Sequence, residues 1–196
     1  SAAVSEGKPI TANIVLPADA GISATTSYSV PKDATLILDV YEPSQTSRSS
    51  EAVTISGTDH LFKAEGGSIV INSGFYKVTG SSKYVIRSGY NPTDKDLKTE
   101  KDKIGKAKTL TGDVVINGGT FESEDSYVMT VWYDSSITIN NGTFVGPKGT
   151  ASDSGSAVNV QTGSTVTIEG GDFSKGKNNT LSAAGTLIVK GGTFDQ

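Results

Sequence analysis

The feature that most constrains the fold is a six-residue motif that recurs five times along the chain. Each copy begins with Ile or Val, has glycine at its fourth position and ends with an aromatic residue. The copies are Ile71–Tyr76, Ile116–Phe121, Ile139–Phe144, Ile168–Phe173 and Val189–Phe194. Repetition with a period of about 20 to 50 residues is typical of solenoids, in which similar units stack along one axis. The motif therefore predicts a stacked repeat rather than a globule around one central core.

The spacing of the closing aromatic residues defines the length of one coil. Successive copies lie 45, 23, 29 and 21 residues apart. We take 21–29 residues as one coil, with a loop insertion in the longest, and interpret the 45-residue interval as two coils, one of them degenerate. This period excludes a hexapeptide β-helix. A β-sandwich also has short, regularly spaced strands, but its turns have no reason to share one motif.

The residues around each motif predict two strands per coil. An alternating run precedes each motif and predicts a strand with one buried face, whose inward pairs are Ile69/Ile71, Val114/Ile116, Ile137/Ile139, Val166/Ile168 and Leu187/Val189. Second strands are expected at Tyr84–Ile86, Tyr127–Trp132, Ala157–Val160 and Thr180–Leu181. Glycine at the fourth position allows a positive φ in every turn. The aromatic rings are then expected to turn inward and stack as a ladder.

The Ile-Asn-Gly-Gly-Thr-Phe form of the motif resembles the repeats of pectin-lyase-like domains in secreted surface proteins, particularly those of Gram-positive gut anaerobes. The resemblance covers about residues 10–196 and implies an all-β, right-handed parallel β-helix. Residues 1–62 carry strand-like runs without the motif, so we expect an atypical N-terminal cap and the first coil or coils there. Residues 63–196 then hold the repeat coils of one continuous domain.

Composition and charge narrow the classes of partner. A charged insertion at about residues 90–109 mixes lysines with acids, which indicates a solvated loop or short helix rather than a basic tract. Because the net charge is −4 and the insertion between residues 91 and 108 has no aromatic residue, we expect no nucleic-acid binding. No apolar stretch approaches the ~18 residues of a membrane span. The absence of cysteine excludes disulfides and thiolate metal sites.

An enzymatic function can be judged by comparing this chain with the catalytic residues of pectin-lyase-like enzymes. The resemblance implies that its lyases place an arginine base beside acidic calcium ligands and that its hydrolases cluster aspartates on successive coils. The chain has two arginines, Arg48 and Arg87, with no acid within three positions of Arg87. His60 is the single histidine, and no Gly-x-Ser-x-Gly motif lies near it. We therefore predict no catalytic residue, no metal site and no cofactor.

A carbohydrate-binding face is predicted on the outside of the second strands. If Met129 and Val131 point inward, the residues that alternate with them in the strand point outward. The residues at equivalent positions in the preceding and following coils are then expected to point outward too. An outward Trp ring stacks on a sugar, and amide side chains bind its hydroxyls. The predicted residues are Arg87, Thr130, Trp132, Asn159 and Gln161. The alternative is that Trp132, adjacent to Tyr133, packs beneath a neighbouring loop.

These observations favour a non-enzymatic bacterial surface protein, secreted or held at the cell surface, that acts as an adhesive or structural stalk. Its expected partner is a glycan or cell-wall polysaccharide. The start of the chain is compatible with a mature exported protein. One alternative is a polysaccharide-active lyase or glycoside hydrolase. The other is a fibre or phage-tail subunit, because the final coil ends at Phe194 without a polar cap, which predicts self-association or continuation beyond Gln196.

Overall fold

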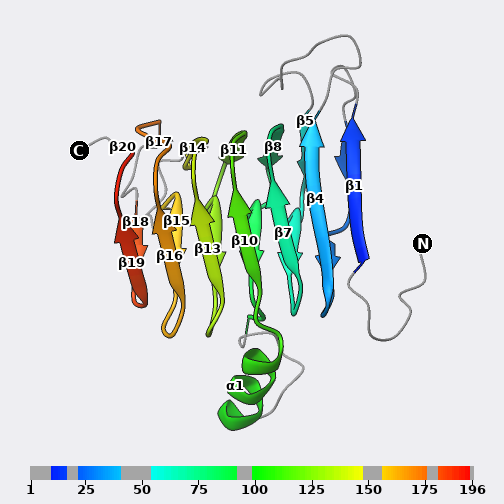
Figure 1. The fold of residues 1–196 in the computed structure, drawn as a ribbon, viewed down its shortest axis with the longest axis vertical. Coiled ribbons are helices and arrows are strands. Elements are labelled where there is room, and N and C mark those ends of the chain that lie inside the picture. Colours follow the sequence, from blue (N-terminus) through cyan, green and yellow to red (C-terminus); the bar gives the residue numbers. More distant parts are fainter. Residues whose placement is uncertain are drawn as a thin grey trace.

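The computed structural model describes residues 10–16, 22–40, 54–91, 99–147, 156–175 and 181–194. Within these ranges the chain forms three parallel β-sheets and one short helix, α1 (Glu100–Thr109). The first sheet, sheet A, consists of β1 (Ile10–Leu16), β4 (Ala34–Val40), β7 (Ser68–Ile71), β10 (Asp113–Ile116), β13 (Ser136–Ile139), β16 (Thr165–Ile168) and β19 (Thr186–Val189). Figure 1 shows these strands side by side.

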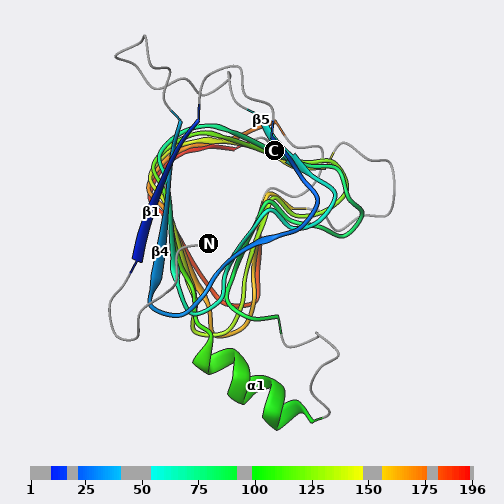
Figure 2. The ribbon, with the colours of Figure 1, turned by 90° about the vertical axis from the view of Figure 1, so that its right-hand side faces the viewer.

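The other two sheets repeat the same order of coils. Sheet B consists of β2 (Ile22–Ala24), β5 (Thr54–Gly57), β8 (Phe75–Val78), β11 (Thr120–Ser123), β14 (Thr143–Val145), β17 (Asp172–Phe173) and β20 (Thr193–Phe194). Sheet C consists of β3 (Tyr28–Val30), β6 (Phe62–Ala64), β9 (Ile86–Ser88), β12 (Met129–Val131), β15 (Val158–Val160) and β18 (Leu181–Ala183). The chain visits the three sheets in turn, and Figure 2 shows the coils superimposed along the axis. The predicted parallel β-helix solenoid is confirmed. The prediction of two strands per coil is wrong, because the residues that close each motif form a third strand, in sheet B.

Equivalent residues of successive coils lie in register. Ile69 pairs with Val114, Val114 with Ile137, and Ile137 with Val166. Both members of the predicted inward pairs are buried in the four coils from β7 to β16. In β19 the pattern weakens, because Leu187 is only half-buried and Val189 is 47% exposed. The alternation of β-branched residues thus forms one wall of a continuous apolar core.

The closing aromatic residues of the motif form the predicted internal ladder. The ring centroids of Tyr76 and Phe121 lie 5.2 Å apart, and the next three spacings are 5.2, 4.5 and 5.0 Å. The planes of Phe121 and Phe144 differ by only 7°. Each such pair contributes about 0.5–1.5 kcal/mol beyond the burial of its surface. The ladder therefore ties every motif-bearing coil to its neighbours.

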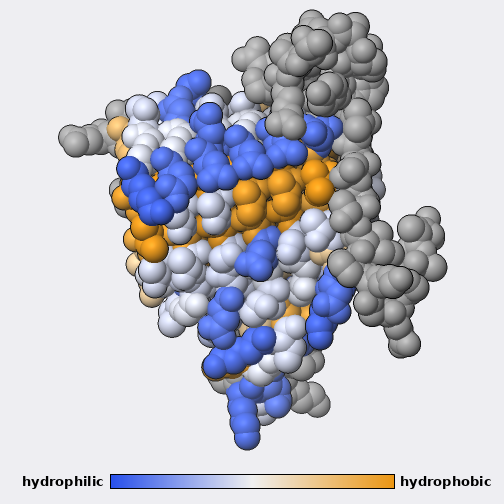
Figure 3. Space-filling view, in the orientation of Figure 1, coloured by the Kyte–Doolittle hydropathy of each residue, from blue (hydrophilic) through white to orange (hydrophobic). Residues whose placement is uncertain are grey.

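Because successive coils lie in register, the outer face of sheet A also carries rows of similar residues. Figure 3 shows an apolar band across this face, parallel to the axis, with a hydrophilic band beside it. At the second position of the motif, the Asn117 Nδ2 atom donates to Asn72 Oδ1 at 2.8 Å, and Asn140 Nδ2 donates to Asn117 Oδ1 at the same distance. One polar position of the motif thus becomes a hydrogen-bonded ladder on the surface.

The prediction of a degenerate coil in the 45-residue interval is wrong. β7 pairs directly with β10 from Ser68 to Ile71, so no coil lies between them. The extra residues instead leave the corner between β9 and β10 and include α1, which projects from the solenoid in Figures 1 and 2. The hydroxyl oxygen of Thr99 caps α1 by accepting a 3.2 Å hydrogen bond from the Asp102 N–H. Length alone does not distinguish a coil from an inserted helix.

In the described part of the segment predicted as cap and first coils, β1 to β5 follow the same three-sheet order, and β6 begins at its last residue. β1, β2 and β3 form one coil, and β4, β5 and β6 form the next. β1 pairs with β4 over seven residues, and β4 pairs with β7, which carries the first motif. The predicted strand-like runs in this segment are therefore coils stacked in register with the repeats. These two coils therefore form without the six-residue motif.

Candidate functional site

The predicted carbohydrate-binding residues are brought together on one face of sheet C. Thr130 of β12 pairs in register with Arg87 of β9 on one side and with Asn159 of β15 on the other. Met129 and Val131, which flank Thr130, belong to the buried core. Successive side chains of a strand point to opposite faces. Arg87, Thr130 and Asn159 therefore form a row on the outer face of sheet C, as predicted from the alternation.

This row is enclosed rather than open to solvent. Arg87, Thr130 and Asn159 are 3%, 0% and 7% exposed, whereas Trp132 and Gln161 at its edge are half-buried. The Nε1 atom of Trp132 is buried. The partial burial of Trp132 agrees with the alternative in which its ring packs against the fold. A ligand can therefore reach the edge at Trp132 and Gln161 directly, but not the centre of the row.

An ion pair and an amide contact hold the row in place. The Arg87 guanidinium pairs with the carboxylate of Glu65, which lies one coil earlier, and both groups are partly or fully buried. The Gln161 Nε2 atom donates a 3.0 Å hydrogen bond to Asn159 Oδ1. Removing one partner of a buried ion pair leaves an uncompensated charge, which is strongly destabilising. Glu65, which sequence reasoning missed, is thus part of this face.

Three buried polar atoms in this region lack a hydrogen-bond partner in the described part of the chain. They are the Oγ1 atom of Thr130, the Nε1 atom of Trp132 and the hydroxyl oxygen of Tyr90. Leaving such a group unsatisfied costs about 1–3 kcal/mol. Buried polar groups are normally satisfied, so each exception calls for a structural or functional reason. The hydroxyls of Ser27 and Ser164 are likewise buried without a described partner elsewhere in the solenoid, so such atoms are not confined to this face.

A second row of rings borders the face on the side where the sheet C strands begin. The His60 and Tyr84 rings lie 4.7 Å apart, and those of Tyr84 and Tyr127 lie 5.8 Å apart. This row precedes the buried residues Leu61, Val85 and Val128, a pattern visible in the sequence once the coils are aligned. His60 is half-buried rather than a freely exposed surface residue. The single histidine is therefore held within a structural stack.

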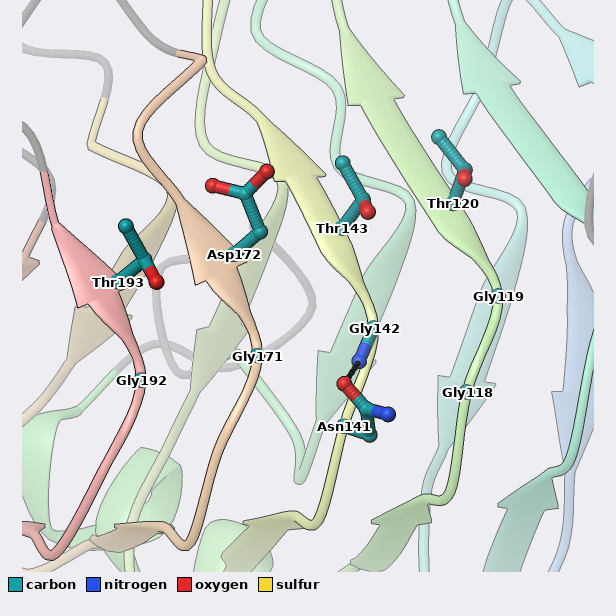
Figure 4. A pocket seen from close by; sticks show the side chains of 10 residues that line it. All are labelled: Gly118, Gly119, Thr120, Asn141, Gly142, Thr143, Gly171, Asp172, Gly192 and Thr193. Carbon is teal, nitrogen blue, oxygen red and sulfur yellow. Dashed lines mark hydrogen bonds between the residues drawn. The ribbon is translucent and has the colours of Figure 1, made fainter.

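A polar groove lies on a different part of the surface, where the glycine turns lead from sheet A into sheet B. It has a volume of about 580 Å³. Figure 4 shows it crossing four coils, with Thr and Asp side chains along one side and the backbone of the turns as its floor. Its lining comprises Gly118, Gly119, Thr120, Asn141, Gly142, Thr143, Gly171, Asp172, Gly192 and Thr193. The motif is interpreted from the sequence only as a turn of the repeat, and no site is predicted there.

Neither a metal-binding cluster nor a membrane-spanning helix is found among the described residues. In the described part of the chain, no group of three or more His, Asp or Glu side chains is placed to bind a metal ion. None of the described helices has the length and apolar character of a membrane-spanning helix.

Comparison with known proteins returned no relative. The chain matches no protein family, no curated protein and no solved structure at a significant level.

Proposed function

We propose that this chain is a non-enzymatic, pectin-lyase-like β-helix module of an exported bacterial surface protein. In this proposal it acts as a rigid stalk that also binds carbohydrate on the outer face of sheet C. The stacked coils support the stalk, because parallel pairing continues from β1 to β19 along sheet A. In a solenoid each coil is stabilised by its neighbours, so an unbroken stack is stiff along its axis.

The observation that carries the binding proposal is the accessible edge of this face, where the half-buried Trp132 and Gln161 follow the paired strands β12 and β15. The Thr130 hydroxyl and the Trp132 Nε1–H are buried without a partner among the described residues. The half-buried ring of Trp132 supplies an apolar surface of the kind that packs against a sugar.

The residues have different roles in this proposal. Trp132 and Gln161 contact the sugar first, because they lie at the accessible edge of the face. Asn159 orients the Gln161 amide through their 3.0 Å hydrogen bond. Arg87 and Glu65 form the buried support below. The ligand is a glycan or cell-wall polysaccharide, and the protein is extracellular.

The polysaccharide-active enzyme is the second candidate, favoured only by the fold. In a lyase the single arginine of this face, Arg87, would have to act as the base. Its guanidinium is instead engaged with Glu65. Product release separates the two candidates, since a lyase yields unsaturated ends and a hydrolase yields reducing ends, whereas a binding module yields neither.

A glycan array combined with two substitutions tests the proposal. The wild-type chain is expected to bind at least one surface glycan, and Trp132→Ala is expected to abolish binding while the melting temperature stays within a few degrees. Thr138→Val, on the outer face of sheet A, is the control that keeps binding. Absence of binding across a broad array, or cleavage of the bound polysaccharide, would contradict the proposal.

A further inference from the structure

The groove between sheets A and B presents one polar side chain per coil. Thr120 pairs with Thr143, Thr143 with Asp172, and Asp172 with Thr193. Neighbouring strands are about 4.8 Å apart, so the four side chains repeat at that interval along the axis. Figure 4 shows all four on the same side of the groove. None of the three threonine hydroxyls bonds to a described residue.

The floor of the groove supplies backbone donors at the same interval. The N–H groups of Gly119, Gly171 and Gly192 have no acceptor among the described residues. The fourth equivalent group, the N–H of Gly142, donates to the side-chain oxygen of Asn141 at 2.9 Å. Asn141 itself lines the groove (Figure 4), so its carboxamide oxygen indicates where an acceptor fits against these N–H groups.

The floor carbonyls are already engaged in the sheet. Gly119 accepts from the Thr143 N–H at 2.9 Å, and Gly171 accepts from the Thr193 N–H at 2.8 Å. The groove therefore offers a row of backbone donors, beside a row of hydroxyls that can donate or accept. Such a site fits a polymer that presents an oxygen acceptor at regular intervals.

We propose that this groove binds a neutral polysaccharide chain that lies along the solenoid axis. The lining includes no Lys or Arg side chain and does include the carboxylate of Asp172. That carboxylate accepts hydrogen bonds from both the N–H and the hydroxyl of Ser174, at 2.9 and 2.6 Å, which hold it in place. The same carboxylate pairs with Lys175 Nζ at 3.7 Å, and the whole chain carries a net charge of −4, so the groove offers no excess of positive charge to a polyanion.

The direction of the groove favours a glycan over a peptide. An extended peptide binds a sheet by pairing with an edge strand, parallel or antiparallel to it. This groove instead crosses β11, β14, β17 and β20, so a peptide in it gains no strand pairing. Its volume of about 580 Å³ falls within the range of ligand sites, about 300–1,000 Å³. The hydroxyl and ring oxygens of an oligosaccharide can accept hydrogen bonds from the row of backbone N–H groups and from the row of threonine hydroxyls.

Affinity electrophoresis tests this inference with defined polymers. The probes are hydroxyethylcellulose, mannan and dextran as neutral chains and polygalacturonate as an acidic one. Retardation by at least one neutral polymer is expected. The double variant Thr120→Val and Thr143→Val removes two groove hydroxyls without changing side-chain shape, and is expected to weaken binding about tenfold. Thr138→Val makes the same replacement outside the groove and is expected to bind like the wild type.

A gain-of-function variant tests the floor donors separately. Asn141→Gly recreates the Gly-Gly pair of three other copies and frees the Gly142 N–H, so binding is expected to tighten about threefold. Unchanged or weaker binding by this variant rejects the role of the floor donors. The groove is rejected if no neutral polymer retards the wild type, if polygalacturonate alone does, or if the double valine variant binds normally. If the double valine variant binds normally but Trp132→Ala loses binding, the groove is rejected and the proposed site on sheet C is retained.

Discussion

The Nδ1 atom of His60 accepts a 3.0 Å hydrogen bond from the backbone N–H of Tyr84, one coil further along the solenoid. Only an unprotonated Nδ1 can accept this bond. Burial, together with the nearby positive charges of Arg87 and Lys83, lowers the pKa of His60 from 6.5 to about 4, although Asp59 opposes the shift. The contact between two coils thus depends on a neutral imidazole.

The first prediction is that acid weakens the fold through His60. Between pH 6.5 and 4 the unfolded chain binds a proton at this residue and the folded chain does not, so stability falls as the pH falls. After allowance for partial solvent screening, the free energy of unfolding is expected to drop by about 2 kcal/mol. Urea titrations at pH 7.5 and 4.2 measure the difference.

His60→Gln provides the control for this prediction. Its stability is expected to change less over the same interval, because glutamine does not titrate. Asp59 contributes only at lower pH: burial raises its pKa, but hydrogen bonds from Lys83 and from the His60 N–H outweigh this and bring it to about 2. An equal pH slope in the variant and the wild type would rule out His60 as the source.

The second prediction concerns the ring ladder. Phe144 is fully buried between Phe121 and Phe173, whereas Phe194 stacks on one ring and is half-buried. Phe144→Leu loses two ring contacts and leaves a void, so we expect a cost of about 2 kcal/mol, and less than half of this for Phe194→Leu. Thermal unfolding of the two variants measures the ranking, and equal shifts would contradict the ladder's role.

The third prediction concerns the glycine turn. Gly119 has φ +107°, and a Cβ atom there would lie 2.9 Å from the Gly74 carbonyl oxygen. Gly119→Ala is therefore expected to destabilise the chain by about 2 kcal/mol or more. Gly105→Ala in α1, where a Cβ meets nothing within 4 Å, is expected to stabilise the helix by about 0.5–1 kcal/mol. Chemical denaturation of both alanine variants checks the opposite signs.

The fourth prediction distinguishes a structural role of the Thr130 hydroxyl from a role in ligand binding. Thr130→Val keeps the shape of the side chain and removes a buried hydroxyl without a described partner. We expect the free energy of unfolding to rise by about 1 kcal/mol. If the hydroxyl serves a ligand, glycan binding on the array is lost at the same time. Greater stability with full binding would show that Thr130 does not contact the ligand.

Parts of the candidate site followed from the sequence, and parts did not. The alternation of side chains is a local property of a strand, and it placed Thr130 on the other face of the strand from Met129 and Val131. The enclosure of Thr130 and its neighbours depends on packing around sheet C, and the pairing of Arg87 with Glu65 joins residues of different coils. The groove arises because Thr120, Thr143 and Asp172 align across coils, a relationship that no single motif contains.

The sequence by itself determined the coil, because a glycine at each turn, a β-branched pair before it and an aromatic residue after it act over a few neighbouring positions. It did not determine that 45 residues hold one coil and a helix, since length carries no register. Only the tertiary structure decided that β7 lies against β10 and that the outer face of sheet C is enclosed. Which strands pair across the 45-residue interval, and how far a face is enclosed, depend on contacts between residues far apart in the chain, and a local pattern does not encode those contacts.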